Sequence, residues 1–264
     1  MIVPSSPLFV HSDIGLGFLA LKRSGATFNP RNIQKSLFDF LSSLSGKANS
    51  GLLFPSFNYN YGQNRIFDVN NDSVQVGALP EWVRNNMNFE RSYIPFFSFL
   101  SDINLNLPLE NEINPFGSKS GFQWLVDNDS TLMLFGTSLN RLTFIHYVEE
   151  ISGSPLYRYI KHFPGKIIKG KDTFLCNVIM HVRPKGVHLD YDWLKLENDL
   201  FEVGIMKKAN YSKNVIILNA KLLLDFWLEK IYKDPFYLID LKSRQHFEVA
   251  TNYGETRVML EQYE

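Results

Sequence analysis

Residues 132–135 read Leu-Met-Leu-Phe, Gly136 follows them, and residues 143–150 read Thr-Phe-Ile-His-Tyr-Val-Glu-Glu. Four consecutive apolar residues that end at a glycine predict a strand buried on both faces. Thr143 can cap the helix that follows, which carries His146, Glu149 and Glu150. A buried strand followed by a helix is the repeating unit of α/β folds.

The same alternation extends from this stretch toward the N-terminus. In chain order we expect a strand at 8–11, a glycine-punctuated loop at 12–17, a helix from Asn29-Pro30 to about Leu44, a strand at 51–54, a polar loop at 58–73 and a helix after Pro80. Strands that alternate with helices in this way predict an α/β fold with a central mixed β-sheet flanked by helices.

The second half of the chain changes character. Residues 166–175 alternate around a Lys-Gly-Lys-Asp turn, which predicts a hairpin. Residues 190–201 and 219–232 have helical periodicity, and Pro235 stops the second of these helices. No linker rich in Pro, Ser or Gly separates the halves, so we expect one domain over 1–264, with a core of 1–155 and a C-terminal hairpin and helix extension over 156–264.

Composition excludes several classes of protein. The chain has 264 residues with 27 Lys+Arg and 27 Asp+Glu, so its formal net charge is zero and it lacks the basic footprint of a nucleic-acid binder. No apolar stretch is long enough to span a membrane, and residues 1–6 lack the basic region of a signal peptide. The single cysteine, Cys176, excludes an internal disulfide framework and fits a reducing compartment. We expect a cytoplasmic protein whose partners are small molecules.

Common catalytic and nucleotide-binding signatures are missing from the sequence. It contains no phosphate-binding Gly-x-x-x-x-Gly-Lys-[Ser/Thr] loop, no Gly-x-Gly-x-x-Gly, no Gly-x-Ser-x-Gly and no His-Glu-x-x-His. The remaining histidines show no spacing typical of metal ligands: His162, His181, His188 and His246. We therefore expect no metal.

The pair His146 and Glu149 carries the chemistry that the residues themselves suggest. Side chains three positions apart on a helix share a face, so the carboxylate can bond one imidazole nitrogen. That bond fixes the tautomer and leaves the other nitrogen as a base. The alternative is a pair that only stabilises the fold, which is the usual role of such a spacing.

Six segments, in order, resemble the aminoglycoside 3-N-acetyltransferase family, also called the antibiotic N-acetyltransferase family. They are His11-Ser-Asp-Ile-Gly, Leu53-Phe-Pro-Ser-Phe57, Val76-Gly-Ala-Leu-Pro-Glu81-Trp-Val-Arg84, Glu90-Arg91-Ser92-Tyr-Ile94-Pro95-Phe-Phe-Ser98, Pro115-Phe-Gly117-Ser-Lys-Ser120 and Thr143-Phe-Ile-His146-Tyr-Val-Glu149. Beyond Tyr157-Arg158 the similarity is loose.

The resemblance implies an acyl-CoA-dependent amino-sugar N-acyltransferase, with acetyl-CoA or another acyl-CoA as co-substrate and direct attack in a ternary complex. It makes His146 the general base and Glu149 the residue that orients it. It also implies roles for residues elsewhere in the matching segments. Those expected near the acyl-CoA are His11, Ser12, Asp13, Arg91, Ser98, Ser120 and Thr143, and those expected to bind the acceptor are Asp68 and Glu81.

Two departures and the C-terminal half suggest the acceptor. Ile94 stands where the family pattern has a histidine, and Asp13 adds a negative charge. The half after Tyr157 is locally basic, and aromatic side chains in it suit a base that stacks on them: Tyr157, Tyr159 and Phe163. We therefore favour a nucleotide-linked amino sugar of surface-polysaccharide synthesis (O-antigen or capsule). The alternatives are an aminoglycoside antibiotic as acceptor, or a catalytically silent relative that binds CoA or a sugar.

Overall fold

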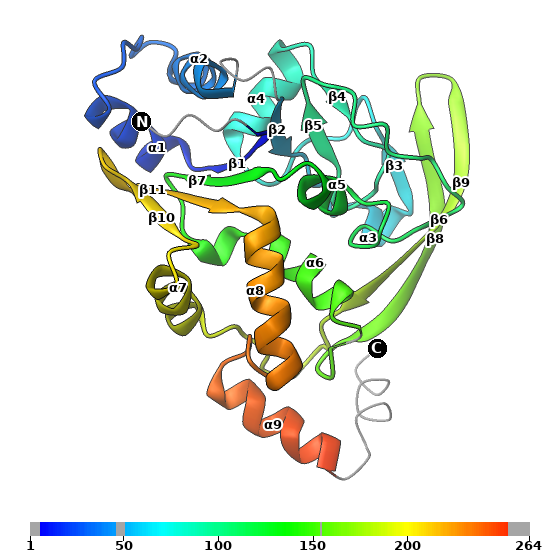
Figure 1. Ribbon diagram of the computed structural model, residues 1–264. Helices are drawn as coiled ribbons and strands as arrows, with labels where there is room; N and C mark the ends of the chain where they lie inside the picture. Colours follow the sequence, from blue (N-terminus) through cyan, green and yellow to red (C-terminus); the bar gives the residue numbers. More distant parts are fainter. Residues whose placement is uncertain (1–5, 46–50, 154, 253–264) are drawn as a thin grey trace.

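A seven-stranded mixed sheet forms the centre of the molecule (Figure 1). The computed structural model describes residues 6–45, 51–153 and 155–252. Across the sheet the strands run in the order β10 (Lys207–Ala209), β11 (Ser212–Asn219), β7 (Thr131–Phe135), β1 (Leu8–Ser12), β2 (Leu52–Pro55), β5 (Phe99–Ser101) and β4 (Glu90–Arg91). The three central strands β7, β1 and β2 are parallel, and the outer neighbours pair antiparallel, which confirms the predicted mixed sheet.

Helices cover both faces of this sheet, because side chains alternate in direction along each central strand. Leu8, Val10 and Met133 pack in one apolar cluster with α1 (Ile14–Arg23), α2 (Ile33–Ser45) and α4 (Ala78–Asn86). Phe9, Leu132 and Leu134 point the other way, into a larger cluster. That cluster includes the helices α5 (Gly121–Asp127), α6 (Phe144–Ile151), α7 (Trp193–Glu202) and α8 (Ala220–Lys233).

A second, four-stranded sheet lies beside the first (Figure 1). Its order is β3 (Ile66–Asp68), β8 (Tyr159–Lys169), β9 (Asp172–Val182) and β6 (Glu112–Ile113). The hairpin β8–β9 turns at Gly170, as predicted, but each strand has 11 residues and is longer than expected. The remaining elements are α3 (Tyr61–Asn64), the 3₁₀ turn η1 (Leu139–Arg141) and α9 (Leu241–Asn252).

The structure corrects three of the sequence-based expectations. The segment 12–17 is not a loop, because α1 begins at Ile14 and the Asp13 side chain accepts a hydrogen bond from Leu16 N at 2.9 Å. Helix α2 begins at Ile33, later than expected, since the side chain that caps it is Asn32. The polar loop 58–73 contains α3 and β3, and β3 pairs with the distant β8.

Glycines explain why α1 was mistaken for a loop. A Cβ on Gly17 would lie 3.0 Å from the Phe135 ring, so this glycine allows α1 to approach the end of β7. It serves packing between elements and does not mark a turn.

Among the described residues, no helix is long and apolar enough to cross a membrane. Residues 1–5, on which the expectation about a signal peptide rests, lie outside the described part of the chain.

Candidate active site

Helix α6 carries a buried carboxylate directly beside a histidine. His146 Nδ1 lies 3.0 Å from Glu149 Oε2, as the spacing of the two residues predicts. The Glu149 side chain is only 2% exposed, whereas the His146 side chain is 32% exposed. The buried carboxylate of Glu149 thus contacts one side of the His146 ring, and the other side of the ring is exposed to a cavity.

Two residues from the second half of the chain complete the inner side of this pair. Arg158 Nε forms an ion pair with Glu149 Oε2 at 2.8 Å, and the Tyr191 hydroxyl donates to Glu149 Oε1 at 2.8 Å. The same hydroxyl lies 3.0 Å from His146 Nδ1, and Arg158 Nη2 lies 3.3 Å from that nitrogen. We call these four residues, His146, Glu149, Arg158 and Tyr191, the histidine cluster.

The charges within the histidine cluster determine its protonation. Burial alone would raise the pKa of Glu149, but the charge of Arg158 and the hydrogen bonds from His146 and Tyr191 outweigh it and lower the pKa to about 2. Burial lowers the pKa of His146, and Arg158 and Arg183 lower it further against the opposing effect of Glu149. At neutral pH the cluster therefore holds a carboxylate and a neutral imidazole. With the Nδ1 proton directed at Glu149, Nε2 carries the free lone pair.

His146 lines a cavity of 420 Å³, which we call the histidine cavity. Its charged lining is mainly basic: Arg141, Arg158 and Arg183, against the single carboxylate of Asp190. Arg158 is neutralised by Glu149, while Arg141 and Arg183 are exposed, and their side chains form no hydrogen bond or ion pair with any described residue. Trp193 and Tyr191 supply aromatic surface.

A second cavity of 520 Å³ opens at the carboxyl ends of the three parallel strands, and we call it the strand-end cavity. It is lined by His11 and Ser12 at the end of β1, by Asp13 directly after them, by Phe57 after β2 and by Thr137 after β7. Asn140, Arg141 and Thr143 line both cavities, so the two adjoin at the start of α6. Ligands of α/β proteins commonly bind outside the carboxyl ends of parallel strands.

Two buried polar atoms beside the strand-end cavity have no hydrogen-bond partner among the described residues. His11 is 7% exposed, and burial lowers its pKa to about 4, so the ring is neutral. His11 Nε2 and Ser12 Oγ are buried and have no hydrogen-bond partner within the described residues. Buried polar groups without a partner are uncommon, and a bound ligand with polar groups would satisfy them.

Six of the residues expected from the sequence lie at these two adjoining cavities, where five line a cavity and Glu149 bonds to His146. They are His11, Ser12, Asp13, Thr143, His146 and Glu149. Asp13 is also the cap of α1, which places its negative charge at the edge of the strand-end cavity.

Three residues expected near the acyl-CoA lie away from both cavities. Arg91 is 8% exposed and donates to the carbonyl oxygens of Ser56 and Asp72 and to Ser98 Oγ. Ser98 in turn donates to Ser56 O at 2.6 Å. Ser120 caps α5 by accepting from Gln123 N. These side chains hold the fold together at the positions where the resemblance suggested a ligand.

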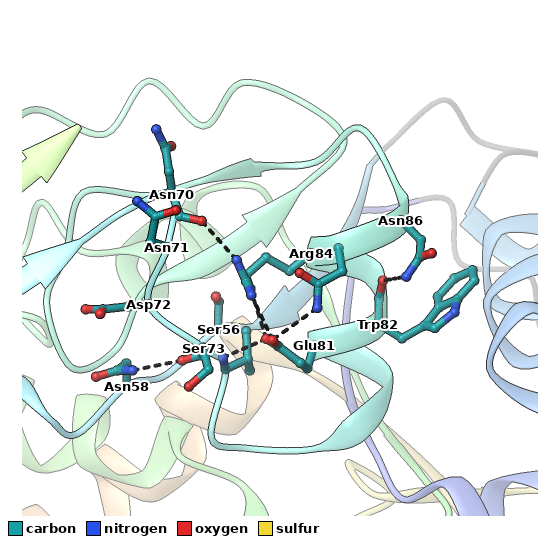
Figure 2. A network of polar contacts seen from close by, with 12 residues as sticks. Ser56, Asn58, Asn70, Asn71, Asp72, Ser73, Glu81, Trp82, Arg84 and Asn86 are labelled. Carbon is teal, nitrogen blue, oxygen red and sulfur yellow. Dashed lines mark hydrogen bonds and ion pairs between the residues drawn. The ribbon is translucent and has the colours of Figure 1, made fainter. Parts of the chain in front are cut away.

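The two expected acceptor-binding carboxylates are also engaged within the protein. Glu81 accepts a hydrogen bond from Val74 N. It also accepts from both Nε and Nη2 of Arg84, and Figure 2 shows these two side chains facing each other. The hydrogen bonds from Arg84 are the main reason why the pKa of Glu81 falls to about 2. Asp68 accepts from the backbone of Asn70 and Asn71, and neither carboxylate lines the two cavities.

Two of the three aromatic residues expected to stack on a nucleotide base, Tyr157 and Phe163, are buried and cannot do so. Tyr157 is 1% exposed and packs against Phe236 and Phe247, and Phe163 is buried against Phe96. Ile94, which replaces the family's histidine, is a core residue.

Arg158 and Tyr191 are the site residues that sequence reasoning missed. Arg158 sits at the end of the last recognisable segment, and its signal was a lone arginine next to Tyr157. Tyr191 lies 45 positions from His146, and no local pattern connects the two. Within the described ranges, no group of three or more His, Cys, Asp or Glu side chains is arranged to hold a metal ion.

Comparisons with known proteins identify the family and the fold. A sequence profile of the aminoglycoside 3-N-acetyltransferase family matches residues 56–231. A sequence search of curated proteins gives no match.

Solved structures share the fold. Aminoglycoside acetyltransferase AAC(3)-Xa superposes with a TM-score of 0.67 at 16% identity, over 90% of this chain and 89% of that chain. A histidine-to-alanine mutant of AAC(3)-IVa in complex with apramycin gives 0.65 at 16% identity, over 89% and 88%. AAC-IIIb in a binary complex with CoASH gives 0.65 at 15% identity, over 87% and 90%.

Proposed function

Since the chain belongs to the aminoglycoside 3-N-acetyltransferase family, whose members are acetyl-CoA-dependent N-acetyltransferases, we propose that it acetylates the amine of an amino sugar with His146 as general base. The observation that carries this proposal is the His146–Glu149 pair, whose histidine lines one of two adjoining cavities. A two-substrate transfer requires adjoining sites for donor and acceptor with a base between them.

The proposed reaction is direct attack of the amine on the thioester. A sugar amine is mostly protonated at neutral pH and has no lone pair until a base removes a proton. Nε2 of His146 accepts that proton, and Glu149 stabilises the imidazolium that results. The neutral amine nitrogen then forms a bond to the acetyl carbonyl carbon and gives up a second proton, while the C–S bond breaks. CoA leaves as a thiolate that takes up this second proton, and the imidazolium of His146 releases the first to solvent.

The strand-end cavity suits the acyl donor. His11 Nε2 and Ser12 Oγ, the unsatisfied atoms there, can bond the amide groups of a pantetheine arm or the thioester carbonyl. The relative AAC-IIIb binds CoASH, and the family's first motif corresponds to this loop. Thr143 and Arg141 then stand between the donor and His146.

The histidine cavity is left for the acceptor, and the relatives support an aminoglycoside. One of the similar structures holds apramycin, and others hold a gentamicin or sisomicin. Asp190 offers one carboxylate for an ammonium group. The relatives thus favour the aminoglycoside acceptor over the nucleotide-linked amino sugar that the sequence suggested.

A nucleotide-linked amino sugar remains the second candidate because of one observation. Arg141 and Arg183 line the histidine cavity without partners among the described residues, and guanidinium groups bind phosphates well. The aromatic side chains that line this space are Trp193 and Tyr191, whereas Tyr157 and Phe163 are buried elsewhere. A silent relative is disfavoured, since it would not need a buried carboxylate held on a histidine.

Release of free thiol from acetyl-CoA tests the proposal and separates the acceptors. Aminoglycosides and nucleotide-linked amino sugars are offered in turn to the purified protein and to Arg183→Ala. An aminoglycoside acceptor predicts turnover that Arg183→Ala leaves unchanged or improves, because a positive charge repels ammonium groups. A phosphate-bearing acceptor predicts a KM that rises about tenfold in Arg183→Ala, as for one lost charged hydrogen bond. Absence of thiol release with every acceptor contradicts the proposed function.

A further inference from the structure

Glu149 has a second layer of partners that lies entirely outside the helix that carries it. Arg158 precedes β8 and Tyr191 precedes α7, yet both reach the same carboxylate. We propose that Arg158 and Tyr191 are positioning residues that hold Glu149 ionised and fixed, so that Nδ1 of His146 stays directed inward and Nε2 faces the acceptor. This inference rests on the proposed function, since it assigns how the base of that reaction is kept ready.

Arg158 is needed because a buried carboxylate does not remain charged unaided. The Arg158 side chain is 9% exposed and the Glu149 side chain 2%, so water screens neither of them. Removal of one partner of such a pair leaves an uncompensated buried charge, which is avoided by protonation. Without Arg158 that proton would be held by the His146–Glu149 pair, so the imidazole would no longer stay neutral with its proton on Nδ1.

Tyr191 fixes the orientation of the carboxylate. Arg158 and His146 both contact Oε2, and Tyr191 donates to Oε1. Tyr157 also lies against this carboxylate, and burial together with the charge of Glu149 raises the pKa of that phenol. Burial raises the pKa of Tyr191 well above its usual value, so the hydroxyl keeps its proton and can donate. With both oxygens occupied, the carboxylate cannot rotate away from the ring.

The second half of the chain holds Tyr191 rigidly in this position. Tyr191 forms an isolated β-bridge with Ile239, and its ring packs against Trp193. It also packs on a small apolar cluster that includes Tyr157, Phe236 and Phe247. The region after residue 155 therefore builds the inner wall of the site.

Arg158 also acts on the charge of the imidazole. The groups that face His146 are Glu149 from its own helix, Arg158, Tyr191, and Arg183 just after β9, with the Phe116 ring at 5.7 Å. Arg158 disfavours the imidazolium and Glu149 favours it. The balance leaves the ring neutral before the acceptor arrives and gives the transferred proton a stabilising partner afterwards.

The test compares Arg158→Met, Arg158→Lys and Tyr191→Phe with two controls on exposed side chains, Arg31→Met and Tyr232→Phe. We expect kcat to fall about a hundredfold in Arg158→Met and about tenfold in Tyr191→Phe, with the KM for acetyl-CoA unchanged. Arg158→Lys, which keeps the charge, should recover kcat to within about tenfold of the unchanged protein. The controls should retain full activity.

Titration of the His146 ring by NMR provides a readout that does not depend on activity. In the unchanged protein we expect the proton of the neutral ring on Nδ1 and a midpoint below the usual histidine value of 6.5. Arg158→Met should move the midpoint to higher pH, because a positive charge near the ring is removed, and Arg158→Lys should restore it. A folding role alone would lower the yield of folded protein without moving the midpoint.

The outcomes separate this inference from the proposed function. An unchanged midpoint together with unchanged kcat in folded Arg158→Met overturns the inference even if acetyl transfer is confirmed. If Arg158→Met does not fold, an unaltered kcat and Nδ1 proton in Tyr191→Phe overturn it. If Arg158→Met shifts the midpoint of the His146 titration but the protein acetylates no acceptor, the positioning role of Arg158 is supported and the proposed reaction is contradicted.

Discussion

Cys176 is the residue that most directly distinguishes direct attack from a covalent acyl-enzyme. It is buried in β9, its thiol lies 3.3 Å from the Tyr61 hydroxyl, and burial raises its pKa. A thiol with a raised pKa and no neighbouring base is a poor nucleophile. We expect Cys176→Ser to retain kcat within about twofold, since the substitution preserves size and a hydrogen-bonding group.

Mass spectrometry of the protein during turnover provides the matching check. The mass should remain that of the unmodified chain. An acetyl group found on Cys176 would contradict direct attack.

At the scale of single residues, the sequence predicted contacts within one helix and missed contacts across the fold. His146 and Glu149 share a helical face, and this follows from their spacing alone. Tyr191 meets them only because the chain returns 42 residues after Glu149, which no local pattern encodes. Arg91 and Glu81 belong to segments that match the family, but their side chains form hydrogen bonds with other residues of the protein. A sequence motif can contain residues that stabilise the fold as well as residues that bind a ligand, and the motif alone does not distinguish them.

Among the elements, the contact between α1 and the end of β7 depends on one glycine. Gly136 has φ of +78°, and a Cβ there would overlap the backbone of Gly17. Gly170 in the β8–β9 turn has φ of +60°, but a Cβ there would meet no atom within 4 Å. A substitution at either glycine would therefore strain the backbone, but only a substitution at Gly136 would also create a steric overlap.

We expect Gly136→Ala to lower the free energy of unfolding by about 3 kcal/mol, the sum of left-handed strain and overpacking. Gly170→Ala should cost only about 1 kcal/mol, the strain alone. Denaturant unfolding of the two variants measures the difference. Equal losses of stability would show that α1 does not press on Gly136 as the structure describes.

Elements with a strong local signal were predicted, and those that depend on distant partners were not. Strands β1, β2 and β7 are short apolar runs, and their burial on both faces produces that pattern. Helix α1 was missed because its glycines look like a loop in sequence and serve packing in space. Strand β3 was missed because it has three residues and pairs with β8, about 100 positions away.

In the whole molecule, the C-terminal half is built into the sheet of the N-terminal half. Strand β11 pairs with β7 over five residues, next to β1, and Ala220 N donates to Ser130 O where α8 begins. Arg158 and Tyr191 reach the histidine cluster from the same half. We propose on these grounds that residues 1–264 form one domain.

A chain that ends at residue 155 tests that organisation. It would lose β11, which pairs with β7. The side chains of the larger apolar cluster that pack against Ile216 and Leu218 would then be exposed to solvent. We expect it to show no cooperative thermal transition, whereas the full chain should unfold in a single one. A truncated chain with a sharp transition of its own would contradict the single domain.

The most direct test of the central claim is the rate of acetyl transfer by His146→Ala with the acceptor that the unchanged protein uses best. Its control is His162→Ala, on the exposed β8–β9 hairpin. In the unchanged protein, kcat should rise with pH through a midpoint below about 6.5 and then level off, because only the neutral ring accepts a proton and its pKa is lowered. His146→Ala should lower kcat by about a hundredfold or more and abolish that rise, while the KM for acetyl-CoA and the activity of His162→Ala remain unchanged. Near-normal turnover with the same pH profile in a folded His146→Ala protein would contradict the account.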